Sequence, residues 1–168
     1  MTADDRAAEA RESMEKALLD RAHANYAEQF RVMARVLGGA IMEADGMACI
    51  AAGSPVDFLN PAIVTLPPAD PATAIRRARA FFERARVPWV LRLTPEAGDG
   101  IVHAAAAAGL VRIDPLPAML LHPLEGKPPG VSTDLSVEVV HDAKTLHTYW
   151  TVLADGFGLP REVTALYD

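Results

Sequence analysis

Hydrophobic and polar positions follow two different periods along this chain, and the changes of period divide it into helices and strands. Over about residues 8–37 apolar residues recur every three or four positions, which predicts a long amphipathic helix. The predicted buried stripe consists of Met14, Leu18, Ala22, Tyr26, Phe30, Met33 and Leu37. Asp4 or Asp5 is expected to cap the start of this helix, and Gly38–Gly39 to end it.

The next segment is typical of a β-hairpin. Residues 40–44 and 47–51 flank Asp45–Gly46, and this dipeptide accepts the positive φ angles that a two-residue turn requires. A third strand is predicted over residues 62–66, because Pro67–Pro68 ends it abruptly.

A helix over residues 71–85 is indicated by its first residues. Asp70 is a capping residue, and Pro71 takes the first helical position, where its missing N–H is harmless. The predicted buried side consists of Ile75, Ala78, Phe82 and Ala85, with Phe81 beside it. The elements expected after it are a strand at 89–93, a helix at 101–108 that ends at Gly109, and strands at 110–113 and 118–122.

The order of these elements predicts an α/β protein, with a mixed sheet and helices on both sheet faces. The strands at 63–66 and 89–93 are expected to be adjacent and parallel, bridged by the helix at 71–85. We therefore assign residues 1–122 to one domain and residues 123–134, rich in Pro and Gly, to a linker. Residues 135–168 are interpreted as the start of a second, truncated domain: a strand at 135–140 and a helix that runs to about residue 154.

The predicted strand at 135–140 has no domain of its own to join. We expect it to pair with the open edge of the hairpin strand at 40–44. Pairing within one chain and exchange between two chains both satisfy that edge, and exchange would give a homodimer. The alternative is that the residues after Pro123 form a mobile tail.

Composition narrows the function classes. With 51% hydrophobic and 23% charged residues the chain is typical of globular proteins, and a net charge of −6 provides no field that favours nucleic acid. Ile101–Leu110, the longest apolar run, is too short to span a membrane. A single Cys49 excludes an internal disulfide, and the chain opens without a basic and apolar leader, so we expect a cytoplasmic protein.

Four segments carry a resemblance to a known family. FLNPAIVTL, RVPWVLRLTP, AAAAGL and PAMLLHPL, in this order, resemble the degenerate N-terminal domain of tandem proteins of the GNAT-type N-acetyltransferase superfamily. The element order over about residues 8–122 is also similar to the GNAT-like acyl-CoA N-acyltransferase fold, without its first strand. The Asp-capped helix followed by Gly-Phe-Gly-Leu-Pro resembles the start of a second such domain. The resemblance implies acetyl-CoA as cofactor and transfer of its acetyl group to an amine, whose identity the sequence does not specify.

The resemblance also implies where acetyl-CoA would bind. In the family the cofactor's pyrophosphate lies between a strand and the central helix, which implies Ile63, Val64, Thr65 and Asp70 as cofactor-binding positions. Here the connection at 67–71 has no glycine, contains three prolines and carries a carboxylate at Asp70, so we expect a vestigial site in this chain. Arg35–Ala40 matches the family's loop pattern literally, but it follows a helix, which favours a helix stop.

No other residue provides a clear catalytic group. Cys49 lies mid-strand without a basic neighbour and is expected to be a buried, inert thiol, and the histidines have no ligand spacing that predicts a metal. Asn60 is expected to cap the third strand through its own backbone, at a position that resembles a marked one in the family. The tyrosines Tyr26, Tyr149 and Tyr167 are interpreted as packing residues, and the arginines Arg76, Arg77, Arg79, Arg84 and Arg86 as a solvated helix face.

The sequence therefore leaves two functional hypotheses open. One is a GNAT-like N-acetyltransferase. The other is a catalytically inactive GNAT-like domain that serves as structural support, as a dimerisation module or as a small-ligand-binding module.

Overall fold

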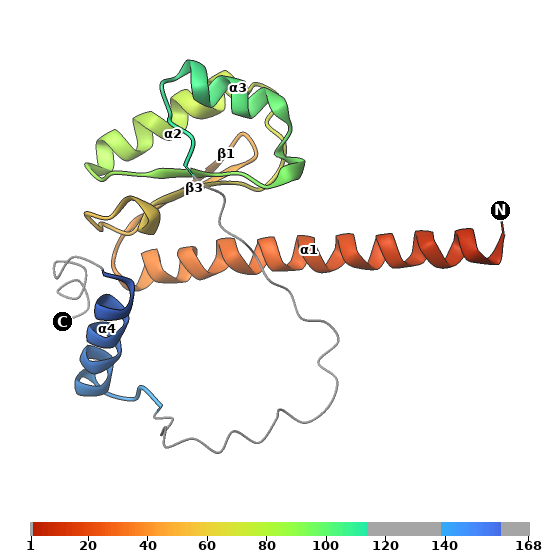
Figure 1. Cartoon of the computed structure of the whole chain (residues 1–168). Coiled ribbons are helices and arrows are strands. Elements are labelled where there is room, and N and C mark those ends of the chain that lie inside the picture. The colour runs from red at the N-terminus through yellow and green to blue at the C-terminus, as the bar shows by residue number, and fades with distance from the viewer. Residues whose placement is uncertain (1, 114–138, 159–168) are drawn as a thin grey trace. The chain divides into compact units, whose positions relative to one another are not determined.

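The computed structural model describes residues 2–113 and 139–158, which belong to two compact units (Figure 1). The first unit contains a mixed sheet and three helices among its described residues, and the second contains one described helix. The predicted mixed α/β class is confirmed for the first unit.

The first unit begins with a long helix, continues with a hairpin and ends with two strand–helix steps. Its elements are α1 (Ala3–Val36), β1 (Ala40–Ala44), β2 (Met47–Ala51), β3 (Pro61–Val64), α2 (Pro71–Ala85), β4 (Val90–Arg92) and α3 (Asp99–Ala107). Two short 3₁₀ turns, η1 (Asp57–Leu59) and η2 (Pro95–Ala97), precede β3 and α3. The strand order is β1-β2-β3-β4, with antiparallel pairing except between β3 and β4, which are parallel.

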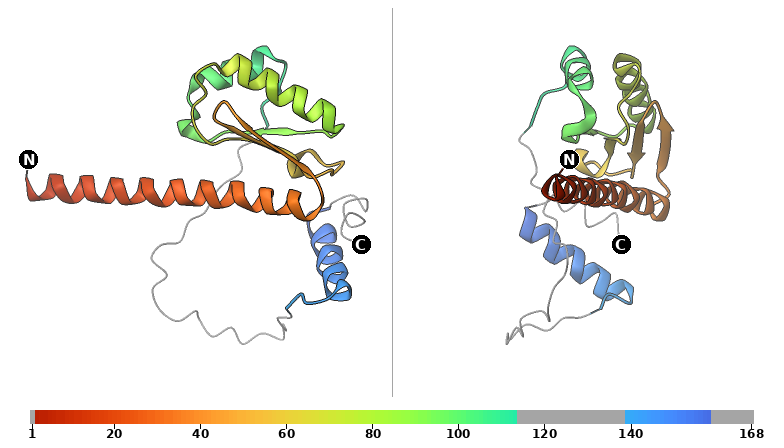
Figure 2. Two further views of the ribbon diagram at one scale, coloured as in Figure 1. Left: turned by 180° about the vertical axis from the view of Figure 1, so that it is seen from behind. Right: turned by 90° about the vertical axis from the view of Figure 1, so that its right-hand side faces the viewer.

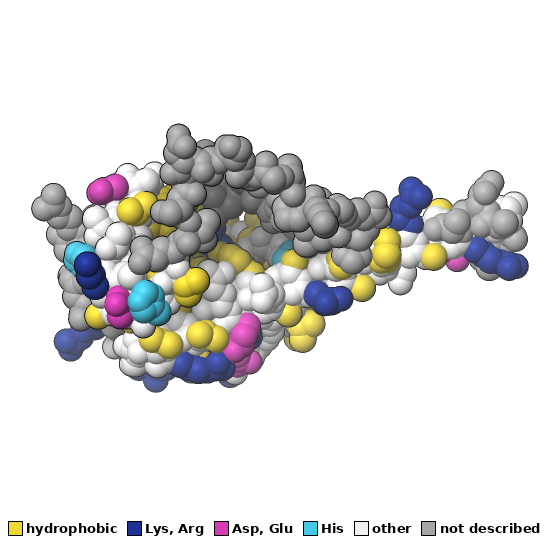
Figure 3. Space-filling model, turned by 90° about the horizontal axis from the view of Figure 1, so that it is seen from below, with side chains coloured by type: hydrophobic (Ala, Val, Ile, Leu, Met, Phe, Trp, Pro, Cys, Tyr) yellow, Lys and Arg dark blue, Asp and Glu magenta, His cyan; other side chains and the backbone are white. Residues whose placement is uncertain are grey.

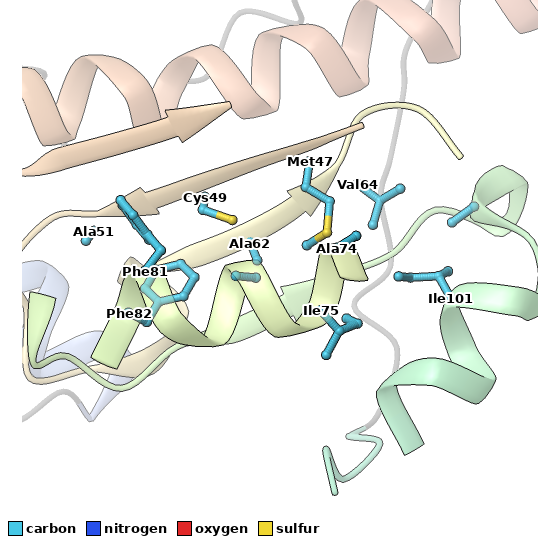
Figure 4. Packing of buried hydrophobic residues seen from close by; sticks show 12 residues of the cluster. Met47, Cys49, Ala51, Ala62, Val64, Ala74, Ile75, Phe81, Phe82 and Ile101 are labelled. Atoms are coloured by element: carbon cyan, nitrogen blue, oxygen red, sulfur yellow. The ribbon is translucent and has the colours of Figure 1, made fainter. Parts of the chain in front are cut away.

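Helices cover both faces of this sheet, as predicted (Figure 2). On one face Phe30 of α1 packs against Ile50 of β2 and Ile63 of β3. On the other face the side chains of Met47 and Cys49 point toward α2 (Figure 4). Since successive residues of a strand point to opposite faces, β2 is buried on both sides, which explains why all five of its residues are buried.

The hairpin has the turn that its sequence predicts. Asp45 and Gly46 have φ angles of 55° and 74°, and Ala44 lies opposite Met47. A side chain on Gly46 would collide with the carbonyl oxygen of Leu66, so the turn also requires glycine for close backbone packing.

The predicted parallel unit is confirmed. Ala62 pairs with Leu91 in parallel register, and α2 connects the two strands. α2 begins at Pro71 and buries Ile75 and Phe82, whose ring stacks on Trp89 at 5.0 Å between centroids.

The start and the buried stripe of α1 differ from the prediction. Thr2 caps the helix and forms a capping box with Asp5, because a hydroxyl and a carboxylate at this spacing satisfy two backbone N–H groups. Met14 and Tyr26 are 52% and 37% exposed, whereas Ala27 is buried. Met14 is exposed because the N-terminal part of α1 extends past the sheet (Figure 1). Tyr26 is exposed because the buried stripe passes through Ala27, Phe30 and Ala34.

The strand predicted at residues 110–113 is wrong. The N–H of Leu110 donates to Ala105 at the end of α3, and Gly109 has a φ of 80°, so this segment continues the helix terminus. Val111 is 87% exposed and belongs to no strand. The predicted strand at 118–122 and the linker at 123–134 lie outside the described residues.

The described part of the second unit is α4 (Ala143–Phe157) and its flanks. Asp142 caps it by accepting from the N–H of Thr145 at 2.7 Å, as an Asp-capped helix was expected to do. The helix passes the predicted end near residue 154 and stops at Gly158, which has a φ of 62°. Residues 139 and 140 are not in a strand, and the remainder of the strand predicted at 135–140 lies outside the described residues.

Candidate functional site

α/β proteins commonly bind ligands at the carboxyl ends of their parallel strands, which here are β3 and β4. β3 ends at Val64 and β4 at Arg92, and α2 and α3 begin just beyond them. A Cβ atom on Gly100 would lie 3.5 Å from Cγ of Pro71, so the N-termini of these two helices adjoin. We call this region the carboxyl end of the sheet.

Three of the implied cofactor positions lie on or just after β3, and each side chain has a structural role. Ile63 is buried in the core beneath α1, and Val64 in the core beneath α2. Thr65 is exposed, and both its N–H and its hydroxyl donate to the carbonyl oxygen of Gly46, at 2.8 and 3.1 Å. The donors of Thr65 therefore hold the hairpin turn.

Asp70, the fourth implied position, caps α2. Its carboxylate accepts from the N–H of Thr73 at 3.0 Å and from the hydroxyl of Thr73 at 2.6 Å. These hydrogen bonds, the one from the hydroxyl most of all, lower the pKa of Asp70 below its ordinary value of 3.8. At neutral pH a negative charge thus sits at the N-terminus of α2, where an anionic ligand would otherwise be favoured.

The neighbouring helix start also carries a carboxylate. α3 has Gly98 as its N-cap, with no side-chain hydrogen bond to the cap, and Asp99 in its first turn. His103 interacts through Nδ1 with the carbonyl oxygen of Asp99 at 2.8 Å. Both helix starts at the carboxyl end are therefore flanked by acidic side chains of the chain itself.

The literal loop match at Arg35–Ala40 ends α1, as expected. Gly38 has a φ of 67°, and the N–H of Gly39 donates to the carbonyl oxygen of Ala34 at 2.7 Å. A side chain on Gly39 would collide with the carbonyl oxygen of Ala51. These N–H groups serve the helix terminus, so they do not converge on a phosphate.

Asn60 is buried at the amino end of β3 and joins three segments of backbone. Its Oδ1 accepts from the N–H of Ala52 at 3.0 Å. Its Nδ2 donates to the carbonyl oxygens of Ser54, Val56 and Pro88, at 2.8, 3.0 and 3.0 Å. Sequence reasoning expected Asn60 to bond its own backbone, but these partners belong to other residues. The amide is fully used, so Asn60 has a structural role.

The other candidates have packing roles. Burial raises the pKa of Cys49 to about 12, so its thiol stays protonated and unreactive. Tyr26 contacts Phe30 edge to face at 5.1 Å, and Tyr149 contacts Trp150 at 5.4 Å. Tyr167 lies outside the described residues. Over residues 2–113 and 139–158, no three His, Cys, Asp or Glu residues come together as a metal site.

The arginines of α2 are exposed, as predicted. Arg76 donates to the hydroxyl of Thr73, Arg77 to the carboxylate of Asp45 at 2.7 Å, and Arg79 to the carbonyl oxygen of Ala108. Arg77 and Arg79 therefore tie α2 to its surroundings, whereas Arg76 bonds a residue of α2 itself, so the three do not form one free basic patch.

A shallow depression of about 590 Å³ lies between β1 and the C-terminal half of α2. Sequence reasoning missed it. It is lined by Met42, Arg77, Ala80, Glu83 and Arg84. No local signal could have revealed it, because Met42 and Ala80 meet only through the tertiary structure.

The projecting part of α1 carries hydrophobic side chains interspersed with Lys and Arg (Figure 3). Its exposed apolar residues include Met14 and Leu19. In the part of the chain that the structure describes, no helix is both long and apolar enough to cross a membrane.

Comparison with protein-family models, with curated proteins and with solved structures finds no match to this chain.

Proposed function

We propose that the first unit is a catalytically inactive GNAT-like domain, which acts as a structural and interaction module and does not transfer acetyl groups. The observation that carries this proposal is the cap of α2. The carboxylate of Asp70 occupies the place where the resemblance puts the pyrophosphate of acetyl-CoA, and it bonds the N–H of Thr73.

The order of the elements supports the GNAT-like part of the proposal. A hairpin is followed by β3, α2 and a parallel β4, and then by α3, as the resemblance implies. The four segments that carry the resemblance lie over β3, β4, the end of α3 and residues 117–124.

Electrostatics and hydrogen bonding support the inactive part. A pyrophosphate needs several backbone N–H groups that point toward it. In the connection at 67–71 only Ala69 and Asp70 have an N–H, because the other three residues are prolines. The negative charge of Asp70 would repel the phosphates at close range.

Calorimetric titration of the full chain with acetyl-CoA tests this proposal. We expect no saturable heat for the wild type, and no acetyl transfer to a panel of amines. Asp70→Ser is the matched variant, since serine also caps helices but carries no charge.

Saturable binding to the wild type would contradict the proposal. If Asp70→Lys then strengthened that binding, the parent activity, acetyl-CoA-dependent transfer to an amine, would become the better description. Loss of that binding on Gly38→Val would instead place the cofactor at the end of α1.

A further inference from the structure

β1 forms one edge of the sheet: among the described residues β2 is its only strand partner (Figure 2). Ala44 and Met47 flank a two-residue turn, so they form a hydrogen-bonded pair, and such pairs recur at every second position of an antiparallel ladder. The N–H and C=O groups of Ile41 and Glu43 therefore point away from β2, toward the open side of β1.

Among the residues that the structure describes, this edge lacks the features that usually protect an edge strand. Natural proteins block such edges with proline, with a bulge or with free charges. β1 pairs with β2 in unbroken register and contains no proline. Its one charged residue, Glu43, already accepts a hydrogen bond from Arg31 at 2.7 Å.

We propose that this edge pairs with the same edge of a second copy of the chain, about a two-fold axis that passes beside Met42. In this register Ile41 lies opposite the partner's Glu43, and Glu43 opposite the partner's Ile41. All outward N–H and C=O groups of these residues then find partners. Met42 lies opposite the partner's Met42, in the closer kind of antiparallel pair.

The neighbouring symmetric registers are less favourable. An axis beside Glu43 would place two carboxylates directly opposite each other. An axis beside Ile41 would need the N–H of Gly39, which already donates to the carbonyl oxygen of Ala34. Charge repulsion and hydrogen bonding together thus select one register.

The depression beside β1 is self-complementary about this axis. It is lined by the apolar Met42 and Ala80 and by side chains of both charge signs, Arg77, Glu83 and Arg84. Arg77 lies at the turn end of the strand, where it bonds Asp45, and Glu83 lies further along α2. Because a two-fold axis reverses the partner, Arg77 faces the partner's Glu83, and the contact occurs twice.

The first test is the mass of the full chain over a concentration series, by sedimentation equilibrium. We expect a reversible dimer of twice the 18.0 kDa chain. Met42→Lys places two ammonium groups opposite each other and should raise the dissociation constant about tenfold or more. Met42→Leu is the matched control and should leave the dimer intact.

The second test uses the alternation of N–H groups along β1, which point in turn toward β2 and toward the open side. Amide exchange of Ile41 and Glu43 should slow as concentration rises, whereas exchange of Met42, whose N–H bonds β2, should not change. Glu43→Pro removes one outward N–H and should abolish the dimer. Glu43→Ala loses the same contact with Arg31 but keeps the N–H, so it should still dimerise.

The charges of Arg77 and Glu83 provide a third, independent test. Arg77→Glu should weaken the dimer, and adding Glu83→Arg should restore it. Circular dichroism establishes that each variant is folded.

Three results would overturn the proposal. One is a monomer at every concentration. Another is a dimer that persists in both Met42→Lys and Glu43→Pro, which would place the interface elsewhere. The third is slow exchange of Ile41 and Glu43 in the monomer, which would mean that the chain's own residues cover the edge.

Discussion

The two ends of the parallel strands β3 and β4 use polar residues in opposite ways. At the amino end Asn60 is fully buried, and its amide bonds four backbone groups. At the carboxyl end Thr65 and Asp70 are exposed and bond groups close to the surface. A buried polar group is costly unless it is satisfied, so the amino end carries stability and the carboxyl end tolerates change.

The largest effect should come from Asn60 at the amino end. Asn60→Ala leaves the N–H of Ala52 and the carbonyl oxygen of Ser54 buried without this partner, and should lower the free energy of unfolding by about 3 kcal/mol. Urea unfolding followed by far-UV circular dichroism measures this loss.

Asn60→Asp is the matched control. It keeps the acceptor for Ala52 but loses the donors and directs a carboxylate at carbonyl oxygens, so it should be at least as destabilising. An aspartate variant as stable as the wild type would show that the donor bonds contribute nothing.

The next effect concerns the close backbone contact between Gly46 and Leu66, near the carboxyl end of β3. Gly46→Ala adds a methyl group where it meets the carbonyl oxygen of Leu66, at a positive φ, and should cost about 2 kcal/mol. Gly38→Ala has a similar φ but open space around the added carbon, so it should cost only the backbone strain. Equal losses in the two variants would mean that the Leu66 contact relaxes freely.

A smaller, pH-dependent effect is expected at Asp70. Because its pKa is lowered in the folded chain from 3.8, its ionised form contributes stability above that value. The contribution should disappear as pH falls through the lowered folded-state pKa. Urea unfolding of the wild type and Asp70→Ser from neutral to acidic pH tests this, and the advantage of the wild type should shrink only at the acidic end. A pH-independent difference would rule out the charge as its source.

The smallest effect should be that of the ion pair between Asp45 and Arg77. Both side chains are partly exposed, at 31% and 57%, so a double-mutant cycle should give a coupling of about 0.5 kcal/mol that salt reduces. A coupling several times larger would make the carboxyl end as important for stability as the amino end.

Local chemistry determined much of this fold from the sequence alone. Asp45–Gly46 fixes the hairpin turn, Asp70–Pro71 the start of α2, and Gly109 the end of α3, because each signal acts over a few neighbouring residues. The parallel pairing of β3 and β4 also followed from the order of elements.

The sequence-based prediction was wrong where local signals competed or were insufficient. Thr2 caps α1 ahead of Asp4 or Asp5, since Asp5 is needed at the third helical position of the capping box. Residues 110–113 have the composition of a strand, but a strand exists only where another strand pairs with it.

Only the tertiary structure decided what the polar residues do. Asn60 reaches Pro88 at a distance of 28 positions along the chain, and Arg77 reaches Asp45 at 32. The stripe of α1 that becomes buried depends on where the sheet ends beneath the helix, and the depression at Met42 depends on how α2 crosses β1. A sequence pattern shows which residues are apolar or can form hydrogen bonds. The partner of each one is decided by packing, because burial and hydrogen bonding are satisfied by neighbours in space.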